Sequence, residues 1–517
     1  MKARYLFFLA CLPFLFLLSG CSTNPVTGKN ELSLISTEQE LAIGKKNYQP
    51  YRQAQGGDYV ADPGVQQYVS SVGQRIARVS DRKLPYEFSV INESTPNAWA
   101  LPGGKIAINR GLLVELESEA ELAAVLGHEI VHAAAKHSAL GMQRGLLLQS
   151  ALIASSIALS DYEYRQLALT GAQIGAGMVN QKYGRDAERE ADYYGMHYMK
   201  KAGYDPAKAV NLQKTFVRLS KDKQSNWLTG LFASHPPSQE RVENNQNTLL
   251  ELGTPEGETG EQVYRQKMAR LIKTRPAYEA FDKAGKAYES KAYEKALSLV
   301  DKAIRIEPKE ALFKGLKGEI LAAQGKKKTA KKYLDEAVAL NPGYFKHYLA
   351  RGFVERDLGN LKLAQNDFTK SNNLLPTSEG HYGLGWLAMK QGNEQLAINN
   401  FRKASSSDST IGKAANLYLA QLDLPNNPER YIKSALALNS RGYLDIYVKN
   451  NSAVAVKNIQ VIVGINQGFS IAEKSSYRLR KTLKPNQSIK LTTGLGPLDK
   501  KTASRFASLV TNASIVK

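Results

Sequence analysis

The spacing of apolar residues predicts a helix over Pro63–Val79, because one stripe at helical period is apolar. That stripe consists of Val65, Tyr68, Val69, Val72 and Ile76. Residues 86–91 and 105–108 alternate apolar and polar positions at the period of two that is typical of strands. The run Glu119–Leu126 is rich in helix formers and has acids in its first turn, which predicts another helix. The first half of the chain is therefore predicted to be a mainly α domain with a small β-sheet.

The second half repeats itself at intervals of 34 residues, with one interval of 33. Prolines and small residues recur in three registers: Pro308, Pro342 and Pro376; Ala296, Ala330, Ala364 and Ala397; and Ala284, Gly318, Gly352 and Gly385. Small side chains let the two helices of a pair approach closely, and proline ends the second helix. The pattern resembles tetratricopeptide repeats, about four of them over roughly 277–410, which form an α-solenoid. An irregular helical bundle is the alternative.

Beyond Pro425–Pro428 the pattern changes to alternation at a period of two. The strand-like runs are 443–448, 456–463, 477–479 and 489–493. Asn450-Asn451 is expected to supply the turn between the first two runs. The C-terminal segment is therefore predicted to be a small β-sandwich.

Basic charge is concentrated in that C-terminal segment. The chain has a formal net charge of +21, and residues 431–517 hold 14 Lys and Arg against 3 Asp and Glu, a difference of +11. Such charge suits nucleic acid, anionic lipid or an acidic protein. The sequence has neither a nucleic-acid fold signature nor a basic stripe interleaved with aromatic residues, so no nucleic-acid partner is expected. Lipid and protein are the expected partners.

The N-terminus has the pattern of a secretory signal, with two basic residues before an apolar run from Leu6 to Leu18. The tetrad that ends in Cys21 resembles a bacterial lipobox, which implies a signal peptide over 1–20 and lipidation of Cys21. Cys11 would leave with the signal, so no disulfide is expected in the mature chain. Acyl chains would anchor the protein in a membrane. Ser22 at the second mature position favours the periplasmic face of the outer membrane.

The run 145–159 is the most apolar of the mature chain. It is too short to span a bilayer, which takes about 20 residues. A buried helix is one interpretation, and a lid that faces a membrane or a substrate is the other.

The strongest chemical signal is the motif His128-Glu129-Ile130-Val131-His132. On a helix, residues four apart lie one above the other, so His128 and His132 present two imidazoles to one point. Neutral imidazole is a good zinc ligand, and Glu129 lies beside that point, able to take a proton from water at the metal. With 7 histidines in 517 residues, a chance match is on the order of one in a hundred or less. The motif therefore predicts one zinc ion per chain.

A catalytic zinc usually has three protein ligands, so a third ligand is expected downstream. The candidates are Glu188, Glu190, Asp192 and His197. If 188–192 is one helical turn, Glu188 and Asp192 share a face while Glu190 points away. A metal ligand and a carboxylate that orients a ligand histidine would need that pairing. A solvated acidic helix face is the alternative.

These motifs resemble the membrane-associated gluzincin metalloproteases, which include CAAX prenyl endopeptidase, the heat-shock membrane protease and the β-barrel assembly-enhancing protease. Their second motif reads approximately Ser-Arg-x-x-Glu-x-x-Ala-Asp, and here Gly184 stands in place of the serine. The resemblance implies that Glu188 is the third zinc ligand and that Asp192 orients a ligand. It covers about residues 24–250. With repeats behind the protease, the chain most resembles the assembly-enhancing type, from which the terminal β-domain departs.

The resemblance also implies roles for two further segments. The block Asn97–Gly104 looks like the family's substrate-side strand and turn, so the substrate-binding residues would be Asn97, Ala98, Trp99 and Ala100. The segment Ser234–Arg241 resembles a late His-Pro…Arg motif. His235 would then act at the catalytic site, either as a donor to the oxyanion or as a residue that closes the metal site.

Together the patterns predict five segments and one activity. The segments are a signal peptide (1–20), an N-terminal tether and helix (21–60), a zinc metalloprotease domain (61–265), tetratricopeptide repeats (266–425) and a β-sandwich (431–517). The implied function is a lipid-anchored zinc endopeptidase of the bacterial cell envelope, which degrades misfolded or stalled envelope proteins. The repeats would recruit substrates or the outer-membrane assembly machinery. The alternative is a chaperone-like assembly scaffold whose protease site is mostly latent.

Overall fold

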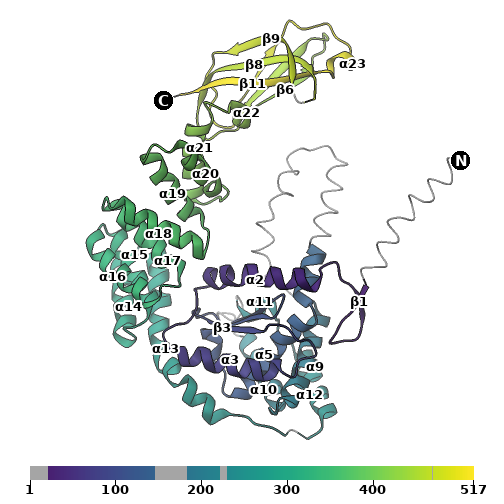
Figure 1. The fold of residues 1–517 in the computed structure, drawn as a ribbon, viewed down its shortest axis with the longest axis vertical. Helices are drawn as coiled ribbons and strands as arrows, with labels where there is room; N and C mark the ends of the chain where they lie inside the picture. Colours follow the sequence, from purple (N-terminus) through teal and green to yellow (C-terminus); the bar gives the residue numbers. More distant parts are fainter. Residues whose placement is uncertain (1–20, 146–182, 222–229, 255, 469, 517) are drawn as a thin grey trace, which may run out of the picture. The chain divides into compact units, whose positions relative to one another are not determined.

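The computed structural model describes residues 21–145, 183–221, 230–254, 256–468 and 470–516, in two compact units that divide between Phe345 and Lys346 (Figure 1). The signal segment 1–20 and nearly all of the apolar run 145–159 lie outside the described residues. Among the described helices, none has both the length and the apolar character needed to cross a bilayer. The predicted segment boundaries stay predictions.

The first unit begins with the elements that build the metal centre. In chain order they are β1 (Cys21–Thr23), β2 (Asn30–Leu32), α2 (Thr37–Ala54), α3 (Pro63–Ala77), β3 (Glu87–Ile91), β4 (Ala98–Leu101), β5 (Lys105–Asn109), α4 (Arg110–Leu113), α5 (Glu119–Ala134), α9 (Arg185–Lys201), α10 (Ala207–Ser220), α11 (Leu231–Ser234) and α12 (Gln239–Leu252). The predicted apolar stripe of α3 is buried throughout. The predicted fold class, a mainly α domain with a small sheet, is confirmed.

The sheet of this region has the strand order β3-β5-β4. β3 runs parallel to β5, with Phe88 opposite Ile106, whereas β4 is antiparallel to β5, with Ala100 opposite Ile106. Every residue of β4 and β5 is buried, so both faces of these strands are covered. β4 is one of the two edge strands of this sheet, and it lies between the two segments, 86–91 and 105–108, that the sequence predicted as strands.

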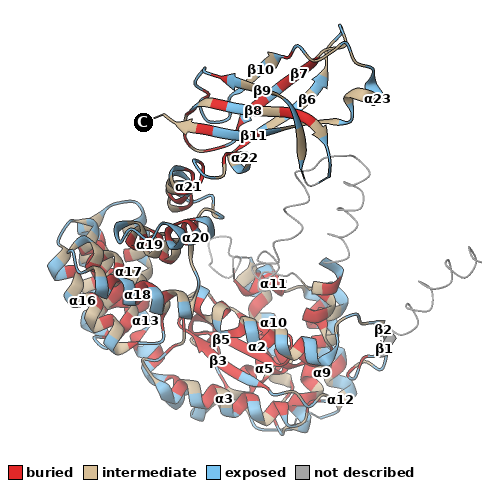
Figure 2. Cartoon of the chain, turned by 45° about the horizontal axis from the view of Figure 1, so that its top comes forward, coloured by how far each residue is buried: buried red, intermediate tan, exposed pale blue. Residues whose placement is uncertain are grey.

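Helix α5 is buried along most of its length and packs against α9 (Figure 2). The two helices touch through glycines. A Cβ on Gly195 of α9 would lie 3.2 Å from the backbone nitrogen of His128, and one on Gly127 would lie 3.4 Å from the carbonyl oxygen of Gly195. The distance at Gly195 is tighter than most real Cβ contacts and the distance at Gly127 is ordinary contact, so the helices are as close as a residue without a side chain at Gly195 allows.

The predicted repeats are helix pairs. The helices are α13 (Glu261–Glu289), α14 (Tyr293–Ile306), α15 (Ala311–Ala323), α16 (Lys327–Leu340), α17 (Phe345–Asp357), α18 (Leu361–Leu374), α19 (Ser378–Lys390), α20 (Glu394–Ala404) and α21 (Thr410–Asp423). The three repeat prolines follow the ends of α14, α16 and α18. The recurring alanines are fully buried, and a Cβ on Gly318 would lie 2.6 Å from Leu334 Cγ. The tetratricopeptide prediction is confirmed, since small residues bring the paired helices together.

The C-terminal part of the second unit is a pair of antiparallel sheets around one core. Its elements are α22 (Pro428–Tyr431), β6 (Ile432–Leu438), β7 (Leu444–Asn450), β8 (Val456–Asn466), β9 (Ile471–Leu479), β10 (Ser488–Thr492), α23 (Lys500–Ala503) and β11 (Phe506–Ile515). The strand orders are β10-β7-β6 and β11-β8-β9. The sandwich prediction is confirmed, although the sequence did not indicate β6 and β11.

The expected turn at Asn450-Asn451 is wrong as a hairpin, because β7 and β8 belong to different sheets. The Asn450 side chain is fully buried and donates to the carbonyls of Val454 and Leu483. These bonds satisfy backbone groups where the chain passes between the sheets. Alternation along the two strands gave their faces correctly but contained no information about their partners.

Gly44 generates a prediction about stability, because α2 crosses the β4–β5 turn at this residue. A Cβ on Gly44 would lie 2.0 Å from the carbonyl oxygen of Pro102. Gly44→Ala should therefore destabilise the protein by about 1–3 kcal/mol or more, since backbone has to move. Gly285→Ala in α13 is the control: no atom lies within 4 Å of its Cβ, and it should stabilise by up to about 1 kcal/mol. Denaturant unfolding measures both, and equal effects would contradict the packing.

Candidate metal centre

Helix α5 places the three motif residues at the centre of the first unit. Ser118 caps its N-terminus by accepting a hydrogen bond from Glu121 N, which fixes where the helix starts. Glu129 and His132 are buried, and the side chain of His128 is 13% exposed. His128 and His132 Nε2 atoms lie 3.0 Å apart, as the four-residue spacing predicts.

Helix α9 brings Glu188 and Asp192 to the same place. Its N-cap is Gly184, which makes no side-chain capping bond. Glu188 Oε1 lies 3.4 Å from His132 Nε2, and Asp192 Oδ1 lies 2.9 Å from His128 Nδ1. The two acids therefore face the histidines of α5 from one side of α9. His197 is partly exposed, contacts its own helix at the Tyr193 carbonyl, and does not join this group.

A fourth side chain completes the group. His235 follows the short helix α11, and its Nδ1 lies 3.2 Å from His128 Nε2 and 3.0 Å from Glu188 Oε1. Ligand atoms of His128, His132, Glu188 and His235 all lie within 4.8 Å of one another. Zinc bonds of about 2.0–2.1 Å in a tetrahedron would separate neighbouring ligands by about 3.3 Å. The observed spacings match the edges of such a tetrahedron.

The chemistry of these donors fits a cation. Asp192 accepts a hydrogen bond from His128 Nδ1. In a neutral His128 the other ring nitrogen, Nε2, therefore carries a lone pair. This nitrogen lies 3.0 Å from His132 Nε2, and a metal ion between them would be bound by both nitrogens when His132 carries its proton on Nδ1. Desolvation on burial lowers the pKa of His132 well below its usual value, which favours the neutral imidazole that binds metals. The donor set of imidazoles and one carboxylate suits zinc.

Glu129 stands next to the group without belonging to it. Its Oε1 lies 3.5 Å from His235 Nε2, and its Oε2 is buried with no hydrogen-bond partner among the described residues. Burial raises the pKa of Glu129, although the nearby His235 and His128 oppose the shift. A buried carboxylate with a free oxygen and a raised pKa is suited to accept a proton.

Arg241 of α12 supports the acids of α9 from behind. Its Nε and Nη2 donate to the two oxygens of Asp192, each at 2.7 Å, and its Nη1 lies 3.0 Å from Glu188 Oε2. Burial alone would raise the pKa of Asp192, but the charge of Arg241 holds that pKa below its usual value. Asp192 is therefore an ionised acceptor, which fixes His128 with Nε2 toward the metal position.

The predicted substrate residues lie on or beside the edge strand β4. Trp99 is buried, donates to Gln55 Oε1 and packs edge-on against Tyr48, so its side chain supports the strand. The Ala100 carbonyl accepts from Ser138 Oγ, whereas Asn97 Oδ1 is buried and has no hydrogen-bond partner in the described part of the chain. Cys21 lies in β1, and its side chain is outside the described atoms.

Sequence reasoning missed two residues of the site, Tyr183 and His137. Tyr183 stacks on His132 with ring centroids 3.8 Å apart, and its hydroxyl lies 2.8 Å from Ser138 Oγ. His137 contacts the far nitrogen of His132 at 2.9 Å. Glu190 is outside the metal group, as expected, yet it reaches His137 at 3.2 Å instead of facing only solvent. The one available signal for His137 was that three of the chain's 7 histidines lie within residues 128–137.

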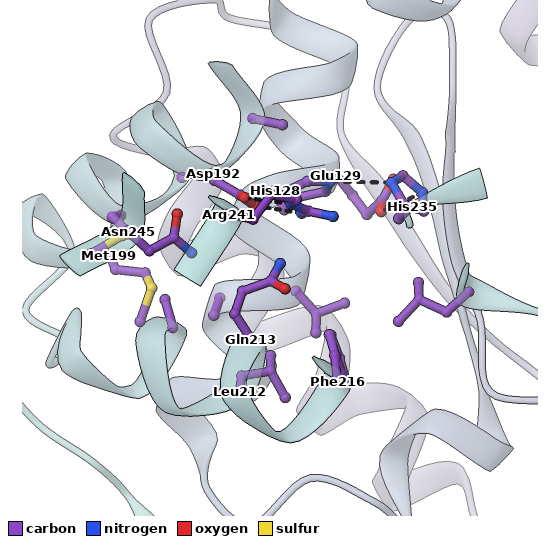
Figure 3. A pocket seen from close by; sticks show the side chains of 17 residues that line it. His128, Glu129, Asp192, Met199, Leu212, Gln213, Phe216, His235, Arg241 and Asn245 are labelled. Atoms are coloured by element: carbon purple, nitrogen blue, oxygen red, sulfur yellow. Dashed lines mark hydrogen bonds and ion pairs between the residues drawn. The ribbon is translucent and has the colours of Figure 1, made fainter. Parts of the chain in front are cut away.

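A pocket opens beside the metal group, between α5, α9, α10 and α12 (Figure 3). Its walls are mostly apolar and include Val125, Met196, Met199, Leu212 and Phe216. His128, Glu129 and His235 line one side, and Gln213 lies across the pocket from them. Gln213 is buried, and its Oε1 has no hydrogen-bond partner among the described residues.

The fold and the site define a class: a helix carries two histidines and a glutamate, and a second helix supplies an acid to the same point, as in zinc metalloproteases. Residues 63–248 match the peptidase family M48, whose members are zinc-dependent. Residues 313–344 and 378–410 match a tetratricopeptide repeat family. The chain belongs to peptidase family M48.

Named relatives agree with this assignment. The metalloprotease YcaL of Escherichia coli is 31% identical, over 34% of this chain and 68% of that protein. The beta-barrel assembly-enhancing protease of E. coli is 28% identical, over 49% of this chain and 52% of its own length. The Yersinia pestis protein of the same name is 25% identical over 61% of this chain and 69% of that protein. The chain therefore spans about half the length of the E. coli assembly-enhancing protease.

The ligand set yields a prediction about metal content. Glu188→Ala should weaken zinc binding at least about tenfold, because it removes the one anionic donor and leaves Arg241 facing the metal position. Asp186→Ala, in the same helix turn, is the control, since its side chain is 90% exposed. Competition of full-length protein with a chromophoric chelator measures both affinities. Unchanged affinity in Glu188→Ala would contradict the assignment.

Proposed function

We propose that this chain is a zinc endopeptidase of the bacterial cell envelope that cleaves misfolded or stalled envelope proteins. The single observation that carries this proposal is the convergence of His128, His132 and Glu188, with Glu129 adjacent to them. A scaffold without catalysis has no use for a buried base beside a metal-binding group. Zinc bound there would supply a Lewis acid that activates water and polarises the scissile carbonyl.

In this mechanism Glu129 is the general base. Its unpartnered oxygen accepts the proton of the attacking water, and the raised pKa lets it hand that proton to the leaving amine. Asp192 holds His128 in the orientation that binds metal, and Arg241 keeps Asp192 ionised. The contribution of the protein is then to hold the Glu129 carboxylate within reach of the attacking water.

An extended substrate would bind along the edge of β4. Strand addition uses main-chain hydrogen bonds, which give affinity with weak sequence preference and suit unfolded proteins. A substrate side chain next to the scissile bond would enter the apolar pocket beside Glu129. The unpartnered Gln213 Oε1 favours a side chain that ends in a hydrogen-bond donor.

The place of His235 favours a latent enzyme, the second candidate that sequence reasoning kept open. Its Nδ1 faces the metal group, while its Nε2 is buried and accepts or donates no hydrogen bond within the described ranges of the chain. Four protein ligands would fill a tetrahedral site and exclude the water that Glu129 must activate. We propose that His235 closes the site and that a partner or substrate withdraws it.

The repeats are proposed to recruit those partners, in line with the tetratricopeptide match. The relatives' name ties them to β-barrel assembly, so the outer-membrane assembly machinery is the proposed partner. Lipid on Cys21 is the proposed anchor, at the periplasmic face of the outer membrane. The proposed partner and the proposed anchor both involve parts of the chain outside the residues 63–248 that match family M48.

The proposed base is tested by Glu129→Gln, which removes the proton acceptor but retains the side-chain shape. Cleavage of an unfolded protein should fall by about 10²–10⁴-fold, whereas zinc content should stay at that of the wild type. Glu243→Gln on the exposed face of α12 is the matched control and should change neither. Wild-type cleavage by Glu129→Gln would eliminate Glu129 as the base.

The proposed closure is tested by His235→Ala. Basal cleavage of an unfolded protein should rise, because the fourth position becomes open to water. If His235 is instead a donor to the oxyanion, cleavage should fall by about 10²–10³-fold. His197→Ala is the control and should have no effect, because His197 lies on α9 outside the metal group and is partly exposed. Unchanged activity of His235→Ala would dismiss both roles.

The proposed anchor is tested in cells by Cys21→Ser. The variant should move from the membrane fraction to the soluble fraction, because acyl chains on one cysteine would be the tether. A high-salt wash removes protein held only by charge, which controls for the basic C-terminal domain. A variant that stays in the washed membranes would contradict anchoring through Cys21.

A further inference from the structure

The ligand histidines of α5 are held from behind in two different ways. His128 contacts a carboxylate, Asp192, in the usual manner. His132 instead contacts a second histidine: its Nδ1 lies 2.9 Å from His137 Nδ1. His137 Nε2 lies 3.2 Å from Glu190 Oε2, and Lys29 Nζ donates to Glu190 Oε1 at 2.7 Å. His132, His137, Glu190 and Lys29 are called the His137 network below.

The contacts of this network are consistent with a metal bound at His132 Nε2. If His132 binds metal through Nε2, its Nδ1 carries the proton and must donate, so His137 Nδ1 accepts. His137 Nε2 then carries a proton, which it donates to Glu190. Lys29 donates to the other oxygen of Glu190 and balances its charge. With Nε2 of His132 facing the metal, every donor in the network therefore meets an acceptor.

The backbone supports this placement of His137. Lys136, which directly follows the end of α5, adopts a left-handed conformation with φ of 60°. A residue other than glycine adopts this conformation at a cost. The turn folds the chain back so that His137 meets His132, only five residues earlier. His137 is buried in this position.

The network ends on the N-terminal hairpin β1–β2, which is docked on the same end of α5. Asn24 is buried and donates to the carbonyl of Ala135, the residue that ends the helix. Asn24 also accepts from the backbone of Val26, and Val26 lies in the main core. The hairpin is thus fixed on α5 by a buried contact independent of Lys29.

We propose that His137, Glu190 and Lys29 are positioning residues for the metal ligand His132, so that the N-terminal hairpin forms part of the metal centre. The proposal rests on the proposed zinc site. A side chain that orients a ligand histidine raises metal affinity, and its loss typically costs about 10–100-fold. The segment directly after Cys21 therefore helps to hold the zinc.

The test is the zinc affinity of full-length variants, measured by competition with a chromophoric chelator. His137→Ala should weaken zinc binding about 10–100-fold. His137→Asn should recover part of that loss, because its side-chain oxygen can stand where Nδ1 accepts. Glu190→Ala should weaken zinc binding less than His137→Ala does, and Lys29→Met should weaken it less again. Each of these residues lies farther along the network from His132. His197→Ala is the control and should bind zinc as the wild type does.

The double variant His137→Ala/Glu190→Ala separates a network from independent packing effects. If Glu190 acts through His137, the double variant should bind zinc no more weakly than His137→Ala. Multiplied losses, or equal affinities of His137→Ala and wild type, would overturn the proposal. Thermal unfolding of the metal-free variants shows whether each variant still folds. Because Lys29 is exposed, Lys29→Met tests the proposal even if a variant at a buried position fails to fold. A wild-type chain that binds no zinc would instead refute the proposed function.

Discussion

The close approach of α5 and α9 is the constraint on which the site depends. At Gly127 and Gly195 the two helices meet without side chains between them. This contact lies beside His128, so the ligands of α5 and the acids of α9 reach one point. A side chain at Gly195 would press on the backbone at His128 and so move the carboxylates of α9 away from the imidazoles. Backbone packing, not the motif alone, therefore assembles the metal centre.

The charges gathered there need one another. Burial would raise the pKa of Glu188, but the facing His235 and His128 hold it well below its usual value. Burial would lower the pKa of His235, but Glu188 and Glu129 raise it. Arg241 adds a positive charge behind both acids of α9. Removal of one member leaves uncompensated charge in a buried place, so the group is expected to form as a unit.

The sequence predicted the parts of the fold and site that depend on local spacing. Residues four apart gave His128 and His132, and the same argument put Glu188 and Asp192 on one face. The repeats followed from the spacing of alanines and prolines. His137 could not be predicted, because its contact with His132 depends on the backbone turn at Lys136. The partners of β7 and β8 were equally hidden, since alternation defines faces and not neighbours.

The most direct test of this account is zinc X-ray absorption on the full-length resting protein, which counts the imidazoles around the metal. The account predicts three imidazoles and one carboxylate oxygen at about 2.0–2.1 Å, from His128, His132, His235 and Glu188. His235→Ala should then show two imidazoles and a water in place of the third. Two imidazoles in the resting wild type would contradict the closed site, and a zinc held without imidazole would contradict the metal centre itself.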